Sequence, residues 1–109
     1  GLISAYAGTK HAGVFSRLGV FSPSTWWDNR FLIGAVSGTG AVRPKRVYVD
    51  SGSPGDDYAN TRDLAQKYRD VGYTEGKDLL YVVEAGGQHN EDYWARRLPN
   101  ALRFLLADL

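Results

Sequence analysis

Three short runs that favour β-strands alternate with helical patterns, and this alternation limits the possible folds more than any other feature of the chain. The strand-like runs span residues 17–21, 45–50 and 79–83, and the helical patterns span residues 2–10, 26–36, 58–71 and 90 onward. Strands that alternate with helices form a parallel sheet with helices on both faces. Right-handed crossovers and short connections place the 45–50 strand between the other two. The sequence therefore predicts an α/β fold built on a three-stranded parallel sheet.

Turn and cap residues mark the ends of these elements. Thr25 is expected to cap the helix at 26–36, and the Ser-Gly-Thr-Gly run at 37–40 is expected to form a loop. The composition of residues 51–57 argues against regular structure there. Gly72 stands where a helix C-cap belongs, and Pro99 is expected to kink the last helix or restart it.

Five aliphatic side chains are expected to be buried in the sheet. They are Val20, Val47, Val49, Leu80 and Val82. Strands with few charges need neighbours on both sides. At least one edge of a three-stranded sheet is therefore exposed, unless another segment or a second chain covers it.

Size and composition exclude several classes of protein. The chain has 109 residues, which is one small domain, and its net charge of +1 gives no bulk attraction to nucleic acid. Its apolar runs are too short to cross a membrane, so a soluble protein is expected, with the cytoplasm slightly favoured. The absence of Cys excludes disulfides, thiol catalysis and Cys-based zinc sites. Two distant histidines make no metal site, and no cofactor is expected.

His89 is the residue that most clearly suggests chemistry. It follows the 79–83 strand on a loop that begins with Gly86 and Gly87, two residues that let the backbone turn sharply. Ligands of open parallel sheets bind where strands end, and α/β serine hydrolases carry their general-base histidine late in the chain. We interpret His89 as a general base, although a loop histidine with only local hydrogen bonds is the alternative.

A general-base histidine needs an acceptor on its second ring nitrogen. The loop after the 45–50 strand offers three carboxylates, Asp50, Asp56 and Asp57. We expect one of them to orient His89, and we prefer Asp56 over Asp57 because Asp57 is placed to cap the following helix. The catalytic candidates are therefore His89, Asp56 and Asp57.

Trp26 and Trp27 follow a strand at the same edge of the predicted sheet. They are interpreted as an apolar wall that binds part of a substrate, with packing in the core and in a lid as the alternative. Arg96 and Arg97 are interpreted as charges on the surface of the last helix.

The chain contains no G-x-S-x-G turn of the kind that carries a serine nucleophile. Ser22 and Ser24 do not stand on such a turn, so neither is expected to be the nucleophile. The chain also contains no Met and starts at Gly1. Together these features favour a fragment, and residues 1–109 are interpreted as one partial domain.

The chain resembles the C-terminal half of an esterase family of the α/β-hydrolases, which includes trilactone siderophore esterases and feruloyl or acetylxylan esterases. The resemblance lies in residues 14–27, 48–52, 60–62 and 86–91, with Tyr93-Trp94 and Leu98-Pro99. It implies that His89 is the general base and that the acid lies between residues 50 and 57. It also implies a Gly-x-Ser-x-Gly-Gly turn just before the helix at 2–10, with Gly1 as its last glycine. The absent half would hold the serine and the oxyanion-hole amides.

The leading functional hypothesis is therefore part of a serine carboxylic-ester hydrolase that supplies the acid and the histidine and is inactive alone. Its partners would be a small-molecule ester and either the N-terminal half or a second copy that covers the sheet edge. No nucleic acid or membrane partner is expected. The alternative is a stand-alone, non-catalytic α/β module that associates with itself through the exposed edge. A truncated chain is a third, weaker hypothesis.

Overall fold

Three parallel strands form the centre of the molecule, and their order is β1 (Arg17–Phe21), β2 (Arg46–Ser53) and β3 (Leu79–Ala85). The structure is a computed structural model that describes residues 1–36 and 42–109, so the loop predicted at 37–40 lies outside the described residues. The helices are α1 (Leu2–Lys10), α2 (Trp27–Ala35), α3 (Tyr58–Asp70) and α4 (Glu91–Leu105). The α/β fold, the order of elements and the central position of β2 are confirmed.

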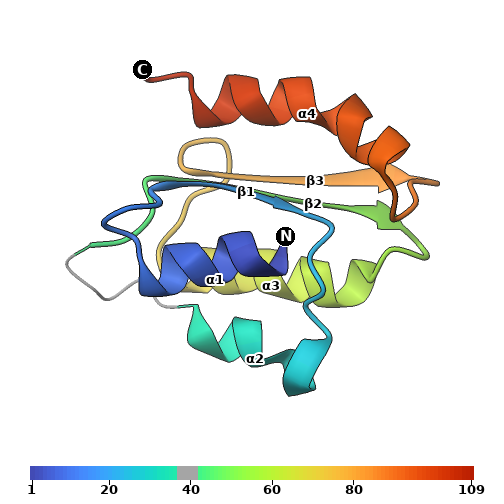
Figure 1. The fold of residues 1–109 in the computed structure, drawn as a ribbon, viewed down its shortest axis with the longest axis horizontal. Coiled ribbons are helices and arrows are strands. Elements are labelled where there is room, and N and C mark those ends of the chain that lie inside the picture. The colour runs from blue at the N-terminus through green and yellow to red at the C-terminus, as the bar shows by residue number, and fades with distance from the viewer. Residues whose placement is uncertain (37–41) are drawn as a thin grey trace.

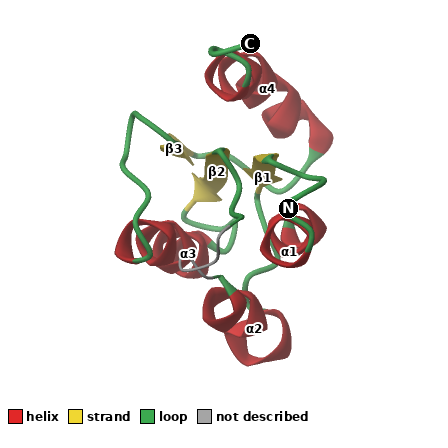
Figure 2. Ribbon diagram, turned by 90° about the vertical axis from the view of Figure 1, so that its left-hand side faces the viewer, coloured by secondary structure: helices red, strands yellow, loops and turns green. Residues whose placement is uncertain are grey.

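The helices cover the two faces of the sheet unequally. In Figure 1 and Figure 2, α1 and α3 lie against one face with α2 beneath them, and α4 alone lies over the other. All three strands point the same way, so their carboxyl ends meet at one edge, to the right in Figure 1. None of the helices in the described part of the chain is long and apolar enough to cross a membrane.

The alternation of side chains along β2 explains the two faces. Val47 and Val49 belong to the apolar core beneath α1 and α3, whereas Tyr48 packs with Ala101 and Leu105 of α4. Successive residues of a strand point to opposite faces, so one short strand supplies both sides.

The predicted burial of the sheet is correct on one face and wrong on the other. Val20, Val47 and Val49 are fully buried. Leu80 and Val82 are only half-buried. Both pack beside the α4 cluster, and α4 lies mainly over β1 and β2, so β3 stays partly uncovered on that face.

Residues 51–53 are part of β2, so the prediction of an irregular loop there is wrong. They pair with residues 83–85 of β3, which is also longer than expected. Gly52 lies so close to Gly87 that a Cβ at position 52 would collide with the Gly87 carbonyl. The small residues that suggested a loop instead allow two strand ends to approach each other closely.

The entry into α2 also differs from the prediction. Thr25 does not cap the helix: its buried hydroxyl has no hydrogen-bond partner among the described residues, and the Trp27 N–H bonds to the Ser24 carbonyl. Residues 28–30 have φ values of 49°, 52° and 63°, which lie in the left-handed region. The right-handed helix is therefore shorter than the sequence pattern indicates.

The ends of α3 and α4 follow their sequence signals more closely. Gly72 has a φ of 113° directly after the last turn of α3, as expected of a residue that ends a helix. Asn90 caps α4 by accepting hydrogen bonds from the N–H groups of Asp92 and Tyr93. The helix continues through Pro99 and does not restart there. Packing of Ala101 and Leu105 against Tyr48 offsets the loss of one N–H.

Candidate active site

His89 and Asp56 are hydrogen-bonded where the loops after β3 and β2 meet. His89 Nδ1 lies 2.8 Å from Asp56 Oδ1, which confirms the predicted pairing. The Asp56 side chain is 2% exposed, whereas the His89 side chain is 56% exposed. A carboxylate only accepts hydrogen bonds, so Nδ1 carries the proton and Nε2 can accept one. Within the described residues, the His89 imidazole makes no side-chain hydrogen bond other than the one to Asp56.

The second oxygen of Asp56 is held by two donors. Asp56 Oδ2 accepts from the Ser22 hydroxyl at 2.5 Å and from the Gly52 N–H at 2.8 Å. The carboxylate is thereby fixed from the side opposite the imidazole. A short O–H···O⁻ bond of this kind is stronger than a bond between neutral groups.

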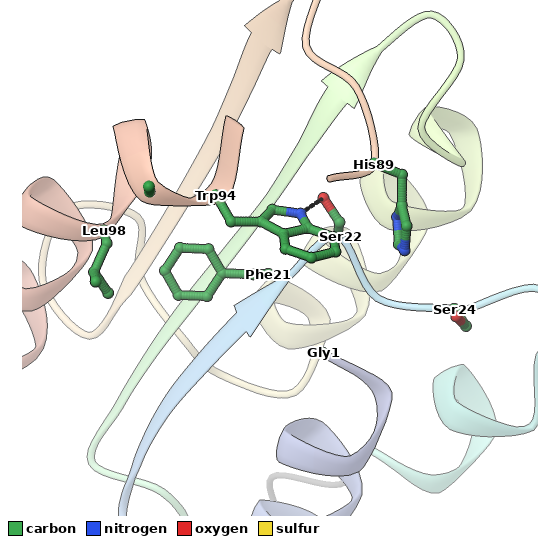
Figure 3. Close-up of a pocket in the computed structure, with 8 residues that line it drawn as sticks. Gly1, Phe21, Ser22, Ser24, His89, Trp94 and Leu98 are labelled. Atoms are coloured by element: carbon green, nitrogen blue, oxygen red, sulfur yellow. Dashed lines mark hydrogen bonds between the residues drawn. The ribbon is translucent and has the colours of Figure 1, made fainter. Parts of the chain in front are cut away.

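Ser22 follows β1 in a backbone conformation that is rare for a non-glycine residue, with a φ of 41°. Its buried hydroxyl accepts hydrogen bonds from Trp94 Nε1 at 3.0 Å, drawn in Figure 3, and from Arg97 Nη2 at 3.2 Å. Because the hydroxyl donates to Asp56 and not to His89, Ser22 lacks the geometry of a nucleophile.

Arg97 is buried, so its interpretation as a surface charge is wrong. Its side chain is 6% exposed and donates to Asp50 Oδ2 at 2.8 Å and to Glu84 Oε1 at 2.9 Å. Burial is the largest single influence and acts to lower the pKa of Arg97, but the charges and hydrogen bonds of Asp50 and Glu84 together outweigh it, so the pKa is raised and the guanidinium stays charged. Arg96 is 65% exposed, as expected.

The sequence carried a signal for the burial of Arg97. Arg97, Ala101 and Leu105 are spaced four residues apart, so they share one face of α4, and all three are buried. An arginine on that stripe is expected to need a buried anion, and Asp50 on β2 supplies it.

Neither of the other two candidate carboxylates orients the imidazole. Asp50 is fully buried and accepts hydrogen bonds from the Tyr48 hydroxyl at 2.7 Å and from the Ser22 N–H at 3.0 Å, besides those from Arg97. Asp57 occupies the N-cap position of α3 with a φ of 48°, and its Oδ1 accepts from Asn60 Nδ2 at 2.8 Å. The expectation that Asp57 serves as a catalytic carboxylate is therefore corrected: the structure brings Asp56 alone of these three to His89.

A cavity of about 370 Å³ lies beside His89. Trp94, Phe21 and Leu98 form apolar parts of its lining, and Gly1 borders it at the start of α1 (Figure 3). The Trp94 indole meets the His89 ring edge to face, with 4.9 Å between ring centroids. A Cβ on Gly1 would collide with the Phe21 carbonyl, so the start of α1 lies tightly against the end of β1.

Trp26 and Trp27 are both exposed, so the alternative of packing in the core is wrong. Trp26 lines a hollow of about 290 Å³ together with Asp56 and His89. Trp27 lines a larger hollow of about 590 Å³ between α1 and α2, which shares Gly1 and Ser24 with the cavity beside His89. Trp26 therefore shares a hollow with the imidazole, whereas Trp27 lines a different hollow that does not include His89.

No cluster of three or more His, Cys, Asp or Glu side chains with the geometry of a metal site occurs within residues 1–36 and 42–109. The chemistry that the described groups offer is that of a histidine base and its carboxylate.

Comparison with known proteins gives one informative match. No family model matches the sequence, and no solved structure matches it. The chain is similar to the uncharacterized protein YbbA of Bacillus subtilis (strain 168), with 28% identity over 116 aligned residues. The alignment covers 96% of this chain and 45% of YbbA, so the chain spans less than half the length of that relative.

Proposed function

We propose that the chain is the histidine- and acid-bearing part of a serine carboxylic-ester hydrolase. The observation that carries the proposal is the 2.8 Å bond between His89 and a buried Asp56, at a cavity that the start of α1 borders. A buried carboxylate that orients a histidine whose other nitrogen is open is the arrangement that general-base catalysis needs.

In this proposal, His89 Nε2 removes the proton from a serine hydroxyl as the serine oxygen attacks the ester carbonyl. His89 then gives that proton to the leaving alcohol, and an acyl-serine remains. A water molecule, deprotonated by the same Nε2, then attacks the acyl carbonyl. The bond from the acyl carbon to the serine oxygen breaks, the imidazolium returns its proton to that oxygen, and the carboxylic acid is released. Asp56 stabilises the imidazolium in both steps and is not itself protonated.

The proposal places the nucleophile before Gly1 in a longer protein. A serine on a strand-to-helix turn that leads into α1 would enter the cavity beside His89, because Gly1 borders that cavity. The lack of room for a Cβ on Gly1 suits the last glycine of such a turn. YbbA is longer than the part that aligns with this chain, which is compatible with a longer protein of this kind.

The proposed substrate is a small ester with an apolar portion. Trp27, Tyr6 and Phe31 line the larger hollow, and Trp27 and Phe31 meet edge to face with 6.5 Å between their centroids. This hollow shares Gly1 and Ser24 with the His89 cavity, so an apolar group bound there would lie next to the cavity in which the ester reacts.

Turnover of p-nitrophenyl acetate tests the proposal. We expect negligible turnover by residues 1–109 alone, and turnover when the preceding half is present on the same chain or added in trans. In the longer protein, His89→Ala should lower kcat by roughly 10⁴-fold or more, as loss of a triad member does elsewhere. His11→Ala is the matched control, since the other histidine of the chain lies exposed at the end of α1.

Two results would contradict the proposal. The first is full turnover by the longer His89→Ala protein. The second is robust turnover by residues 1–109 that disappears in His89→Ala, because the nucleophile would then lie within this chain, with Ser22 and Ser24 as the first residues to test.

A non-catalytic module that associates with itself is the second candidate. The observation that favours it is the outer edge of β1. On the side away from β2, β1 has no neighbouring strand in the described part of the chain. This edge flanks a hollow of about 280 Å³ lined by Ile3, Phe15 and Leu18. Sedimentation of the longer protein as a dimer, together with no ester turnover, would favour this candidate over the hydrolase.

A further inference from the structure

The Ser22 hydroxyl has all its hydrogen-bonding capacity in use. A serine hydroxyl has one proton to donate and two lone pairs that accept. Trp94 Nε1 and Arg97 Nη2 both donate to Ser22 Oγ, so the proton has one remaining direction, towards Asp56 Oδ2. The direction of this hydroxyl is thus set by its neighbours and does not depend on the substrate.

The Asp56 carboxylate receives its orientation from that hydroxyl. Asp56 Oδ2 accepts from Ser22 and from the Gly52 N–H, which leaves Oδ1 for the imidazole. The Gly52 bond alone would let the carboxylate rotate about its Cβ–Cγ bond. The second donor to Oδ2 removes that freedom and keeps Oδ1 aligned with Nδ1 of His89.

The donors that hold Ser22 are themselves fixed. Arg97 is locked by Asp50 on β2 and by Glu84 on β3. Trp94 packs edge to face against His89, so one indole contacts both the hydroxyl and the imidazole. The hydrogen-bonded chain therefore runs from a buried ion pair to the general base.

The backbone at Ser22 is strained in order to place this hydroxyl. Its φ of 41° is one that glycine adopts freely and serine rarely does. The Ser22 N–H is held by the carbonyl and the carboxylate of Asp50, which keeps the residue in that conformation. Strained residues of this kind cluster at functional sites.

We infer that Ser22 is a positioning residue, whose hydroxyl fixes Asp56 and through it the imidazole of His89. This inference rests on the proposed function. It assigns to the strained serine a role distinct from that of the nucleophile, and it makes Arg97 and Trp94 the supports of that role.

The test uses two substitutions of Ser22 in the longer, ester-hydrolysing protein. Ser22→Ala removes the hydroxyl and keeps the strain, whereas Ser22→Gly removes the hydroxyl and relieves the strain. Both should lower kcat by about tenfold to a hundredfold, the effect of losing a hydrogen bond to a charged group, with KM changed by less than about twofold. Ser51→Ala is the matched control, because Ser51 is a buried serine of β2 whose hydroxyl has no partner among the described residues.

A double-mutant cycle with Asp56→Ala separates positioning from a merely structural role. If Ser22 acts through Asp56, adding Ser22→Ala to Asp56→Ala should change kcat by less than about twofold, so the two effects are not additive. Full additivity would overturn the inference, as would wild-type kcat in Ser22→Gly.

The two proposals fail in different ways. If His89→Ala abolishes turnover while both Ser22 variants retain it, the proposed function stands and this inference is wrong. If His89→Ala retains turnover, the proposed function and this inference are both wrong. Should Ser22→Ala not fold, the Ser22→Gly variant, whose backbone suits the observed φ, decides the matter.

Discussion

The two faces of the sheet are built by the same strands but differ in chemistry. The face beneath α1 and α3 is lined with aliphatic and aromatic side chains, among them Val47, Val49 and Leu64. The face beneath α4 carries a small apolar cluster next to a buried network of Asp50, Arg97 and Ser22. The apolar face and the charged face are separated only by the pleat of β2.

The apolar face stabilises the fold, whereas the charged face orients the side chains of the candidate site. Burial of apolar side chains stabilises the folded chain without demanding a unique geometry. A buried ion pair contributes little net stability, since desolvation offsets most of the attraction, but it leaves few arrangements open to its members. The charged face therefore fixes the orientation of its polar side chains, and through them the orientation of Asp56 and His89.

Among the variants that compare the two faces, Arg97→Met is expected to cause the largest loss of stability. It leaves Asp50 buried without its cation, which should lower the free energy of unfolding by about 3–5 kcal/mol. Arg96→Met is the matched control, because the neighbouring, exposed arginine also pairs with Glu84 and should change stability by about 1 kcal/mol or less. Urea denaturation measures the free energy of unfolding of both variants. Equal losses of stability would show that the buried ion pair matters no more than the exposed one.

A somewhat smaller loss of stability is expected from Leu64→Ala on the apolar face. The side chain is fully buried in α3, and its truncation should cost about 2–5 kcal/mol. Turnover measured below the unfolding transition should stay near wild type, since Leu64 belongs to the apolar cluster on the other face of the sheet. Leu102→Ala, at a half-exposed leucine of α4, should cost clearly less. A loss of kcat in a folded Leu64→Ala protein would break the division between the two faces.

The smallest loss of stability is expected from substitution of Asn90, which lies at the start of α4 next to His89. Asn90→Ala removes the side chain that accepts from the N–H groups of Asp92 and Tyr93, and should cost about 1 kcal/mol. Asn90→Ser keeps a capping oxygen and should retain most of that stability. Thermal denaturation followed by circular dichroism compares the two variants, and identical midpoints would show that the cap is dispensable.

Much of the fold could be predicted because its signals are local. The strand at 17–21, the helix at 2–10 and the glycine after α3 all lie where their spacing and residue types indicate. The pairing of His89 with Asp56 was also predictable, since adjacent parallel strands bring the loops at their carboxyl ends together. At residues 51–53, pairing with β3 overrode the local preference for a loop. At Thr25, the hydroxyl is buried and does not cap the helix.

The order of the elements, the parallel sheet and the histidine loop follow from the sequence alone, because periodicity, glycines and caps act over a few residues. The burial of Arg97 and the hydrogen bond from Ser22 to Asp56 could be seen only in the tertiary structure. Those outcomes depend on how residues up to 75 positions apart in the chain converge, as Ser22 and Arg97 do. The direction of a side chain at such a meeting point is set by all its neighbours at once, and that information becomes available only when β1, β2 and α4 are packed together.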